Sequence, residues 1–246
     1  MKPGFNGLPG PRRPPAGPTH SILHSRDKLQ CLIAVLVWTG WIALSACATT
    51  PRPQGGEVGP SWTCDEEADR ALSEGDLERG IQLHEAFLET HPDDALALYH
   101  LGFAYGQSGN HEREIACYER AAALGFSKGG LFFNLGMAYG EIGKPRKAVA
   151  AFQRAIQTDA RNADYRMGLG LALEKTGDME GAARSLEEAL RLDPSLSDAR
   201  WYLARIRVET GRHDEAEAQL RELLRIDPGH PWARELLRKL ESGQRP

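Results

Sequence analysis

The sequence predicts an all-α protein built as an α-solenoid, in which helix-turn-helix repeats stack in a row and a last helix caps the end. The main observation is a set of five glycines that stand 34 residues apart without slippage. Each glycine is followed by a polar residue and then by apolar residues at helical spacing, which is typical of a turn that opens a helix. Hydrophobic residues make up 41% and charged residues 26% of the 246 residues, as in globular proteins. The glycines are Gly75, Gly109, Gly143, Gly177 and Gly211.

The first 46 residues are typical of a leader rather than of the solenoid. Residues 1–28 are rich in Pro, Gly and Arg and cannot build an apolar core, so we expect them to be disordered. A sixteen-residue apolar run follows at 31–46. A bilayer core needs roughly 20 apolar residues of helix, so this run is short for a stable span and fits the apolar section of a secretory signal. We therefore assign 1–46 to a signal peptide and the Pro- and Gly-rich segment 47–60 to a flexible tether.

The end of the apolar run, Leu44-Ser45-Ala46-Cys47, resembles the lipobox of bacterial lipoprotein precursors. The resemblance implies cleavage before Cys47, a diacylglycerol on its sulfur and an acyl chain on the new amino group. Several acyl chains hold a protein firmly on a membrane, whereas one chain does not. Ala48 follows, and by the same resemblance it favours the outer membrane over the inner one, with the chain facing the periplasm. The long leader leaves two alternatives open, an uncleaved signal anchor with Cys47 as a buried thiol, or a misplaced start codon.

The repeat unit resembles the tetratricopeptide repeat, a helix-turn-helix unit of 34 residues. Its first helix, here called helix A, carries Leu-Gly and then Tyr three residues later. Its second, helix B, carries a small residue, an aromatic residue and Ala at helical spacing, and ends at Pro, which cannot continue a helix. The matching residues are Leu101, Gly102, Tyr105, Leu135, Gly136 and Tyr139 in helix A, Ala148, Phe152 and Ala155 in helix B, and Pro92, Pro194 and Pro228 at its end. The resemblance implies a right-handed α-solenoid with repeats at 61–94, 95–128, 129–162, 163–196 and 197–230, and a capping helix with a tail at 231–246.

This pattern folds because each repeat buries its apolar face only against its neighbours. Small residues let helices A and B approach closely, and a turn glycine takes a positive φ without steric cost. Glu114 occupies the small position of the second repeat, so we expect its two helices to pack differently there. In the capping helix we expect Trp232 and three leucines to cover the last repeat.

The resemblance also implies a binding surface, because partners of this family usually bind along the A helices that line the inner face. The corresponding positions form an apolar row with a charged end. Met adapts its shape and aromatic rings supply buried area, so we expect the row to bind an apolar or amphipathic peptide segment of a protein partner. In the alternative, these side chains only pack between neighbouring A helices or are covered by the tether. The predicted partner-binding residues are Leu96, Tyr99, Phe103, Phe133, Met137, Met167, Leu171, Trp201 and Arg205.

Other functions lack a supporting pattern. A formal net charge of −4 gives no reason to expect a nucleic-acid partner. The four Cys show no CxxC spacing and the eight His no HExxH pattern, so we expect no metal site, no disulfide framework and no cofactor. We find no nucleophile–base set and predict no catalytic residue and no enzymatic activity.

The sequence therefore predicts a non-enzymatic, lipid-anchored scaffold of the bacterial cell envelope. It resembles tetratricopeptide lipoproteins that help to assemble envelope machines such as a pilus or a secretion system. That specific role rests on analogy. The alternative is a regulatory adaptor of an envelope enzyme such as a peptidoglycan hydrolase.

Overall fold

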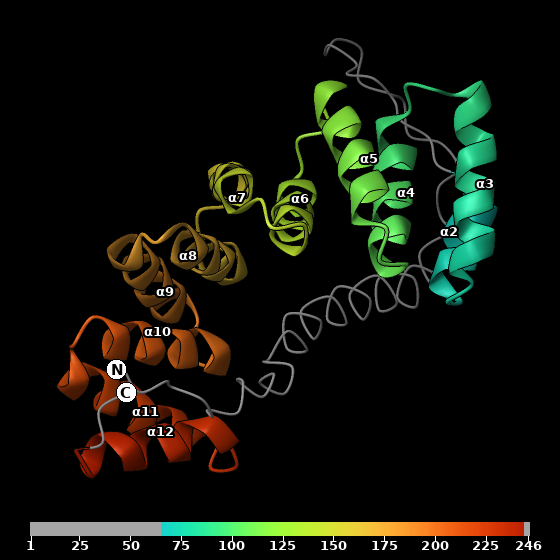
Figure 1. The fold of residues 1–246 in the computed structure, drawn as a ribbon. Coiled ribbons are helices and arrows are strands. Elements are labelled where there is room, and N and C mark those ends of the chain that lie inside the picture. The colour runs from blue at the N-terminus through green and yellow to red at the C-terminus, as the bar shows by residue number, and fades with distance from the viewer. Residues whose placement is uncertain (1–64, 244–246) are drawn as a thin grey trace, which may run out of the picture. The chain divides into compact units, whose positions relative to one another are not determined.

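In the computed structural model, residues 65–243 are described, and every regular element in this range is an α-helix (Figure 1). The predicted all-helical class is confirmed. The leader, Cys47 and the tether lie outside the described residues. No helix in the range 65–243 is both long and apolar enough to cross a membrane. In chain order the helices are α2 (Glu66–Ser73), α3 (Leu77–Thr90), α4 (Ala95–Gln107), α5 (His111–Ala123), α6 (Gly129–Glu141), α7 (Pro145–Thr158), α8 (Ala163–Thr176), α9 (Met179–Leu192), α10 (Ser197–Glu209), α11 (His213–Ile226) and α12 (Pro231–Glu241).

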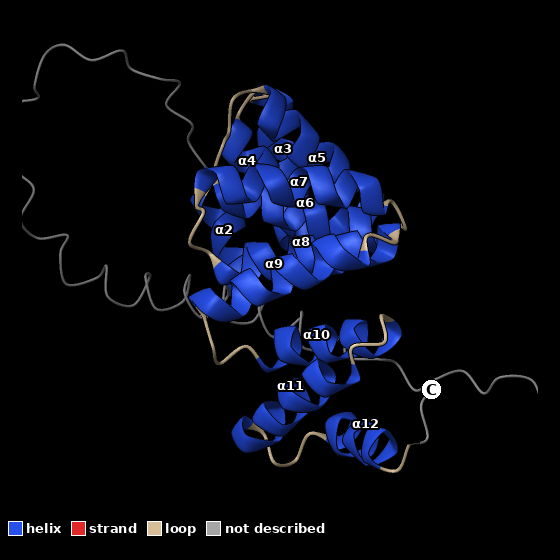
Figure 2. Ribbon diagram, turned by 90° about the vertical axis from the view of Figure 1, so that its left-hand side faces the viewer, coloured by secondary structure: helices blue, strands red, loops and turns tan. Residues whose placement is uncertain are grey.

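The helices form consecutive pairs, each joined by a short turn (Figure 2). In each pair, helix A is the even-numbered member and helix B the odd-numbered one. From α4 onward, helix A begins every 34 residues, at 95, 129, 163 and 197, and α12 begins at 231. Each helix contacts the next one along the chain, and the A helices also contact one another, α4 with α6, α6 with α8 and α8 with α10. The repeats therefore stack in sequence order.

The turn glycines adopt the predicted positive φ, between 68° at Gly143 and 88° at Gly177. In all five turns the N–H of the residue after the glycine donates to a carbonyl five residues earlier, at 2.7–3.0 Å, which closes helix A. In all five turns the same residue is the N-cap of helix B, and in three of them its side chain caps the helix. At Asp178, for example, the side chain accepts from the N–H of Gly181 at 2.8 Å. One Gly-polar dipeptide thus ends one helix and starts the next.

Close contact between helices A and B depends on small residues, as predicted. A Cβ added at Gly102 would lie 2.7 Å from the Tyr118 ring, and one at Gly136 would lie 2.8 Å from the Phe152 ring. These distances are too short for real Cβ contacts, so only glycine fits without a shift. The second repeat also packs in its own way, because the buried Glu114 carboxylate lies against Gly106.

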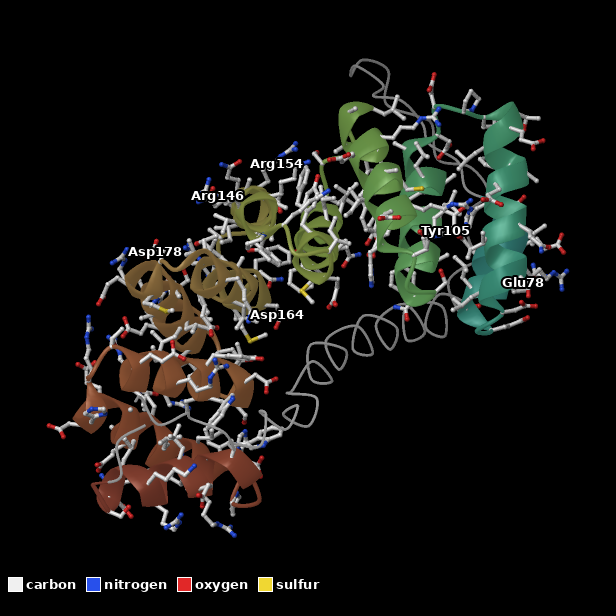
Figure 3. All side chains as sticks on the ribbon, viewed as in Figure 1. Glu78, Tyr105, Arg146, Arg154, Asp164 and Asp178 are labelled. Atoms are coloured by element: carbon white, nitrogen blue, oxygen red, sulfur yellow. The ribbon has the colours of Figure 1, made fainter. Side chains whose placement is uncertain are left out.

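A side-chain bond of constant register is found at four of the five junctions in the described array; at the junction of the third and fourth repeats the equivalent residues are Gln153 and Leu173. In two repeats a helix A tyrosine donates to a glutamate twenty residues earlier, on helix B of the preceding repeat. Figure 3 shows Tyr105 reaching from α4 toward α3 in this way. In the fifth repeat, arginine replaces tyrosine as the donor on helix A. At the capping helix the order is reversed, since the arginine lies on helix B and the glutamate on α12. The pairs are Glu85–Tyr105, Glu119–Tyr139, Glu187–Arg207 and Arg221–Glu241.

The apolar core is divided into clusters that share helices, so it continues from α3 to α12. The central cluster contains Tyr118, Phe126 and Phe152. In the last cluster, Trp201 packs with leucines of α11 and with Leu240 of α12. Trp232 covers the last repeat less completely than predicted, since it is 39% exposed and its ring lies 6.2 Å from that of Trp201.

Candidate functional site

The predicted partner-binding residues all lie on the A helices α4, α6, α8 and α10, which contact one another in sequence. We call this surface the A-face. It consists of Leu96, Tyr99 and Phe103 on α4, Phe133 and Met137 on α6, Met167 and Leu171 on α8, and Trp201 and Arg205 on α10.

The structure separates these residues into two groups by exposure. Met167 and Trp201 are buried, at 6% and 8% relative exposure, and both belong to core clusters. The other seven are half-buried. Met167 and Trp201 therefore contribute to the packing of the repeats, while the rest retain surface that a ligand can contact.

Tyr99 and Phe133 use much of their rings in packing, Tyr99 within its own repeat and Phe133 against the next repeat. The Tyr99 ring lies 5.1 Å from that of Phe126, and the Phe133 ring lies 5.4 Å from that of Tyr165 on α8. Burial, and secondly the neighbouring Tyr165, raises the pKa of Tyr99 to about 12. Both side chains are half-buried, so only part of each ring stays exposed.

Phe103 differs from the other aromatic residues of the A-face. It is half-buried, and it packs against none of the core clusters formed by residues 65–243. Met137 and Leu171 occupy the same position in the next two repeats, and both are partly buried side chains that pack against core clusters. Phe103, Met137 and Leu171 therefore form a row of half-buried apolar side chains at one position of three consecutive repeats.

Arg205 lies on α10, at the end of the A-face, and its positive charge is paired with Glu174. Its guanidinium donates to Oε1 of Glu174 at 3.0 Å and lies over the Tyr202 ring, 5.5 Å from the centroid. The Glu174 side chain is only 9% exposed. Arg205 therefore bridges α8 and α10, and the A-face is apolar along α4 and α6 and polar at α10.

Two surface hollows and the buried thiol of Cys117 show no feature of a binding or catalytic site. Two shallow hollows lie away from the A-face, one along the first turns of α3 and one at the turn between α4 and α5, and both are lined mainly by polar residues. Burial raises the pKa of the Cys117 thiol to about 11, which keeps it protonated and unreactive near neutral pH. Cys117 packs in the core, as the sequence predicted.

The structure also brings together three residues that the sequence did not connect. Asp69 on α2, His84 on α3 and His100 on α4 have donor atoms within 4.8 Å of one another. They are 15 and 16 residues apart on separate helices, so no linear motif marks them. Only the stacking of the three helices places them at one point.

Two sequence models described as tetratricopeptide repeat match the chain. One matches residues 66–126 and 133–197, and the other matches residues 175–240. The chain belongs to the tetratricopeptide repeat family. These ranges contain all five turn glycines, so the family assignment covers the helix pairs on which the A-face is built.

Solved structures of tetratricopeptide repeat proteins share this fold. MamA superposes with a TM-score of 0.65 at 23% identity, over 67% of this chain and 96% of that one. YrrB, a TPR protein with an unusual peptide-binding site, gives 0.65 at 24% identity, over 69% and 87%. MamA from Desulfovibrio magneticus RS-1 gives 0.64 at 18% identity, over 67% and 93%. No curated protein sequence matches the chain. At these identities the likeness shows the fold alone.

Proposed function

We propose that this tetratricopeptide repeat protein is a non-enzymatic scaffold whose A-face binds an apolar or amphipathic peptide segment of a protein partner. The half-buried row that runs from Phe103 through Met137 to Leu171 carries the proposal. Apolar side chains that keep exposed surface gain free energy when a ligand covers them, at about 25 cal/mol per Å² buried. The description of YrrB as having a peptide-binding site supports this use of the fold.

The chemistry of the A-face indicates what the segment looks like. Met137 and Leu171 adapt to aliphatic side chains, and the Phe103 ring offers a flat contact. The paired charges of Glu174 and Arg205 at the far end favour a polar residue at one end of the ligand. An amphipathic helix with apolar residues at i, i+3, i+4 and i+7 fits this order, with its polar side facing water.

We further propose that the scaffold is anchored by lipid on Cys47 in the bacterial cell envelope. It faces the periplasm, with the outer membrane favoured, and helps to assemble a pilus or secretion machine. The lipobox-like Leu44-Ser45-Ala46-Cys47 supports the anchor. A flexible tether of about a dozen residues keeps the repeats close to the membrane, which raises the effective concentration of the scaffold for membrane-bound partners.

The A-face is tested by photo-crosslinking in cells, with a photoreactive residue at Leu171 and the captured partners identified by mass spectrometry. We expect Phe103→Glu to abolish capture, because it places a carboxylate in the apolar row. The matched control is Ala116→Glu, which adds the same charge at an exposed position of α5 in the same repeat. Capture that is equal in both variants and wild type overturns the proposal. Trp201 is unsuitable for this test, since it is buried and its replacement by Glu would unfold the last repeat.

The anchor is tested separately by metabolic labelling with an alkyne fatty acid. We expect Cys47→Ala to lose the label and Cys117→Ala to keep it, since Cys117 is a core thiol. Equal labelling of the Cys47→Ala variant and the wild type contradicts lipidation at this residue and leaves the proposal for the A-face intact.

A further inference from the structure

Asp69, His84 and His100 meet where the first repeat packs on the second. Oδ1 of Asp69 lies 2.7 Å from Nδ1 of His100 and 3.3 Å from Nε2 of His84. The two imidazole rings are 5.8 Å apart at their centroids and inclined at 68°, so they meet edge to face rather than stacking. One carboxylate and two imidazoles, each from a different helix, therefore converge on one point.

His84 is the residue that needs an explanation. Its side chain is 0% exposed, and among the described residues neither of its ring nitrogens has a hydrogen-bond partner. Its contact with Asp69 is close but does not meet hydrogen-bond geometry. A buried polar group without a partner is costly, so such groups in folded proteins usually mark an ion, a water molecule or a functional role. If His84 served only to fill space, an apolar side chain such as leucine would do so without leaving two polar nitrogens unsatisfied.

We propose that Asp69, His84 and His100 bind a divalent first-row transition metal ion such as Zn²⁺. Two imidazole nitrogens and one carboxylate oxygen are a ligand set that these ions accept. In a tetrahedral site with bonds of about 2.0–2.2 Å, ligand atoms stand roughly 3.3–3.5 Å apart. The His84–Asp69 separation already has this value, and the His100–Asp69 pair needs to open by less than about 1 Å to reach it. Three protein ligands leave the fourth position to water or to a side chain of a partner.

The ion would act at one end of the described array. The first repeat has a neighbour on one side only within the array, and its helix A, α2, has eight residues against thirteen or fourteen in the A helices of the later repeats. The ligands come from α2, α3 and α4, so one ion joins both helices of the first repeat to the second. Metal binding is therefore expected to stabilise this end of the array.

The competing interpretation is a hydrogen-bond network in which Asp69 accepts from both imidazoles and no ion binds. That arrangement accounts for His100 at 2.7 Å. It does not account for His84, whose nitrogens lack hydrogen-bond geometry. The two interpretations differ in whether the full-length protein takes up one equivalent of metal.

The test is a calorimetric titration of the chelator-treated full chain with Zn²⁺, followed by Co²⁺ substitution and absorption spectroscopy. We expect one equivalent to bind and the Co²⁺ spectrum to show tetrahedral nitrogen and oxygen ligation. Asp69→Asn and His100→Ala should each weaken Zn²⁺ binding by more than about tenfold, the smallest loss typical of even the outer-shell groups of a metal site. Neither side chain is fully buried, so both variants are expected to fold, which circular dichroism checks.

The matched control is His91→Ala, which removes an exposed histidine at the end of α3. All variants keep the four cysteines, so any binding to thiols is common to them and cancels. A Zn²⁺ affinity that is the same in Asp69→Asn, His100→Ala and His91→Ala overturns the proposal, as does a wild type that binds no Zn²⁺ at all. A second measurement is the melting temperature, which Zn²⁺ should raise in the wild type and in His91→Ala but not in the two ligand variants.

Discussion

Gly106 on α4 lies against the buried carboxylate of Glu114 on α5, and a single methyl group added at Gly106 would overlap it. Glu114 is fixed there by a contact of 2.8 Å with Nδ1 of His111. We expect Gly106→Ala to destabilise the protein by about 1–3 kcal/mol, the usual cost of overpacking. The matched control is Gly140→Ala one repeat later, where a Cβ meets open space in the described structure. It should stabilise by up to about 1 kcal/mol because alanine favours the helix. Urea midpoints that shift alike in both variants contradict this packing.

The clash at Gly106 depends on Glu114, so a second substitution should relieve it. The same two positions hold Glu174 and Ala182 in the fourth repeat, and Val208 and Ala216 in the fifth. A larger residue on helix A therefore stands opposite alanine on helix B. We expect the double variant Gly106→Ala/Glu114→Ala to be more stable than the sum of the two single changes by about 0.5–3 kcal/mol. An additive result in the same urea titration shows that the carboxylate is not what excludes the methyl group.

The Glu187–Arg207 bond between the fourth and fifth repeats should tolerate exchange of both charges better than reversal of the Arg207 charge alone. The Arg207 side chain is 7% exposed and also lies 3.1 Å from Glu215. Arg207→Glu therefore leaves a buried carboxylate without an opposite charge, beside two half-exposed glutamates, and should cost about 3–5 kcal/mol. Adding Glu187→Arg should recover part of this loss, because the Arg221–Glu241 pair already has that order. A double-mutant cycle measures the recovery, and the same exchange at the exposed Glu188–Arg191 pair should change little.

Burial of Tyr99 predicts that stability falls at high pH. The phenol has a pKa of about 12 in the folded protein, because burial disfavours the charged form. In the unfolded chain it ionises near pH ~10. The contribution of Tyr99 is thus fully present below pH ~10 and is lost between about pH 10 and 12, by roughly 2–3 kcal/mol. Guanidinium midpoints measured across this range should fall less steeply in Tyr99→Phe than in the wild type. Equal slopes mean that Tyr99 ionises alike in both states.

The turn at Gly177 requires a left-handed backbone, with φ at 88°. No described atom lies near its Cβ position, so any cost of substitution arises from the backbone alone. We expect Gly177→Ala to cost about 1–2 kcal/mol, and Gly177→Asn to cost less, because asparagine adopts this conformation more readily. Thermal unfolding of both variants checks the order. A loss that is larger for asparagine than for alanine indicates steric crowding instead.

Most of the fold was predictable because repeats of this family contact only their neighbours. The Gly-polar dipeptides mark where helices A and B meet, and a fixed period then places every later pair. Gly177 and Asp178 illustrate this, since one ends α8 and the other caps α9 within the same local segment. Each helix contacts the next one along the chain, so the order of the helices follows directly from the order of the sequence.

The exposure of the A-face was less predictable, because equivalent positions have different neighbours. Tyr99 and Trp201 occupy the same position of their repeats. Trp201 is buried at the last repeat, where His230 and Trp232 lie beside its ring at 5.3 and 6.2 Å. Arg205 finds Glu174 on the previous helix A, a partner that its own repeat does not reveal. A repeat pattern treats equivalent positions as identical, so it does not predict which neighbouring side chains bury each of them.

The charges of the side-chain bonds between repeats differ along the array, so they affect which whole repeats the chain could lose. Excision of residues 95–128 would set Glu85 against Tyr139, which reproduces a junction already present upstream. Excision of residues 197–230 would instead set Glu187 against Glu241, two acids in place of the Glu–Arg pairs that now stand at the last two junctions. We therefore expect loss of a whole repeat to be tolerated better near the beginning of the array than next to the capping helix, whose Glu241 now pairs with an arginine.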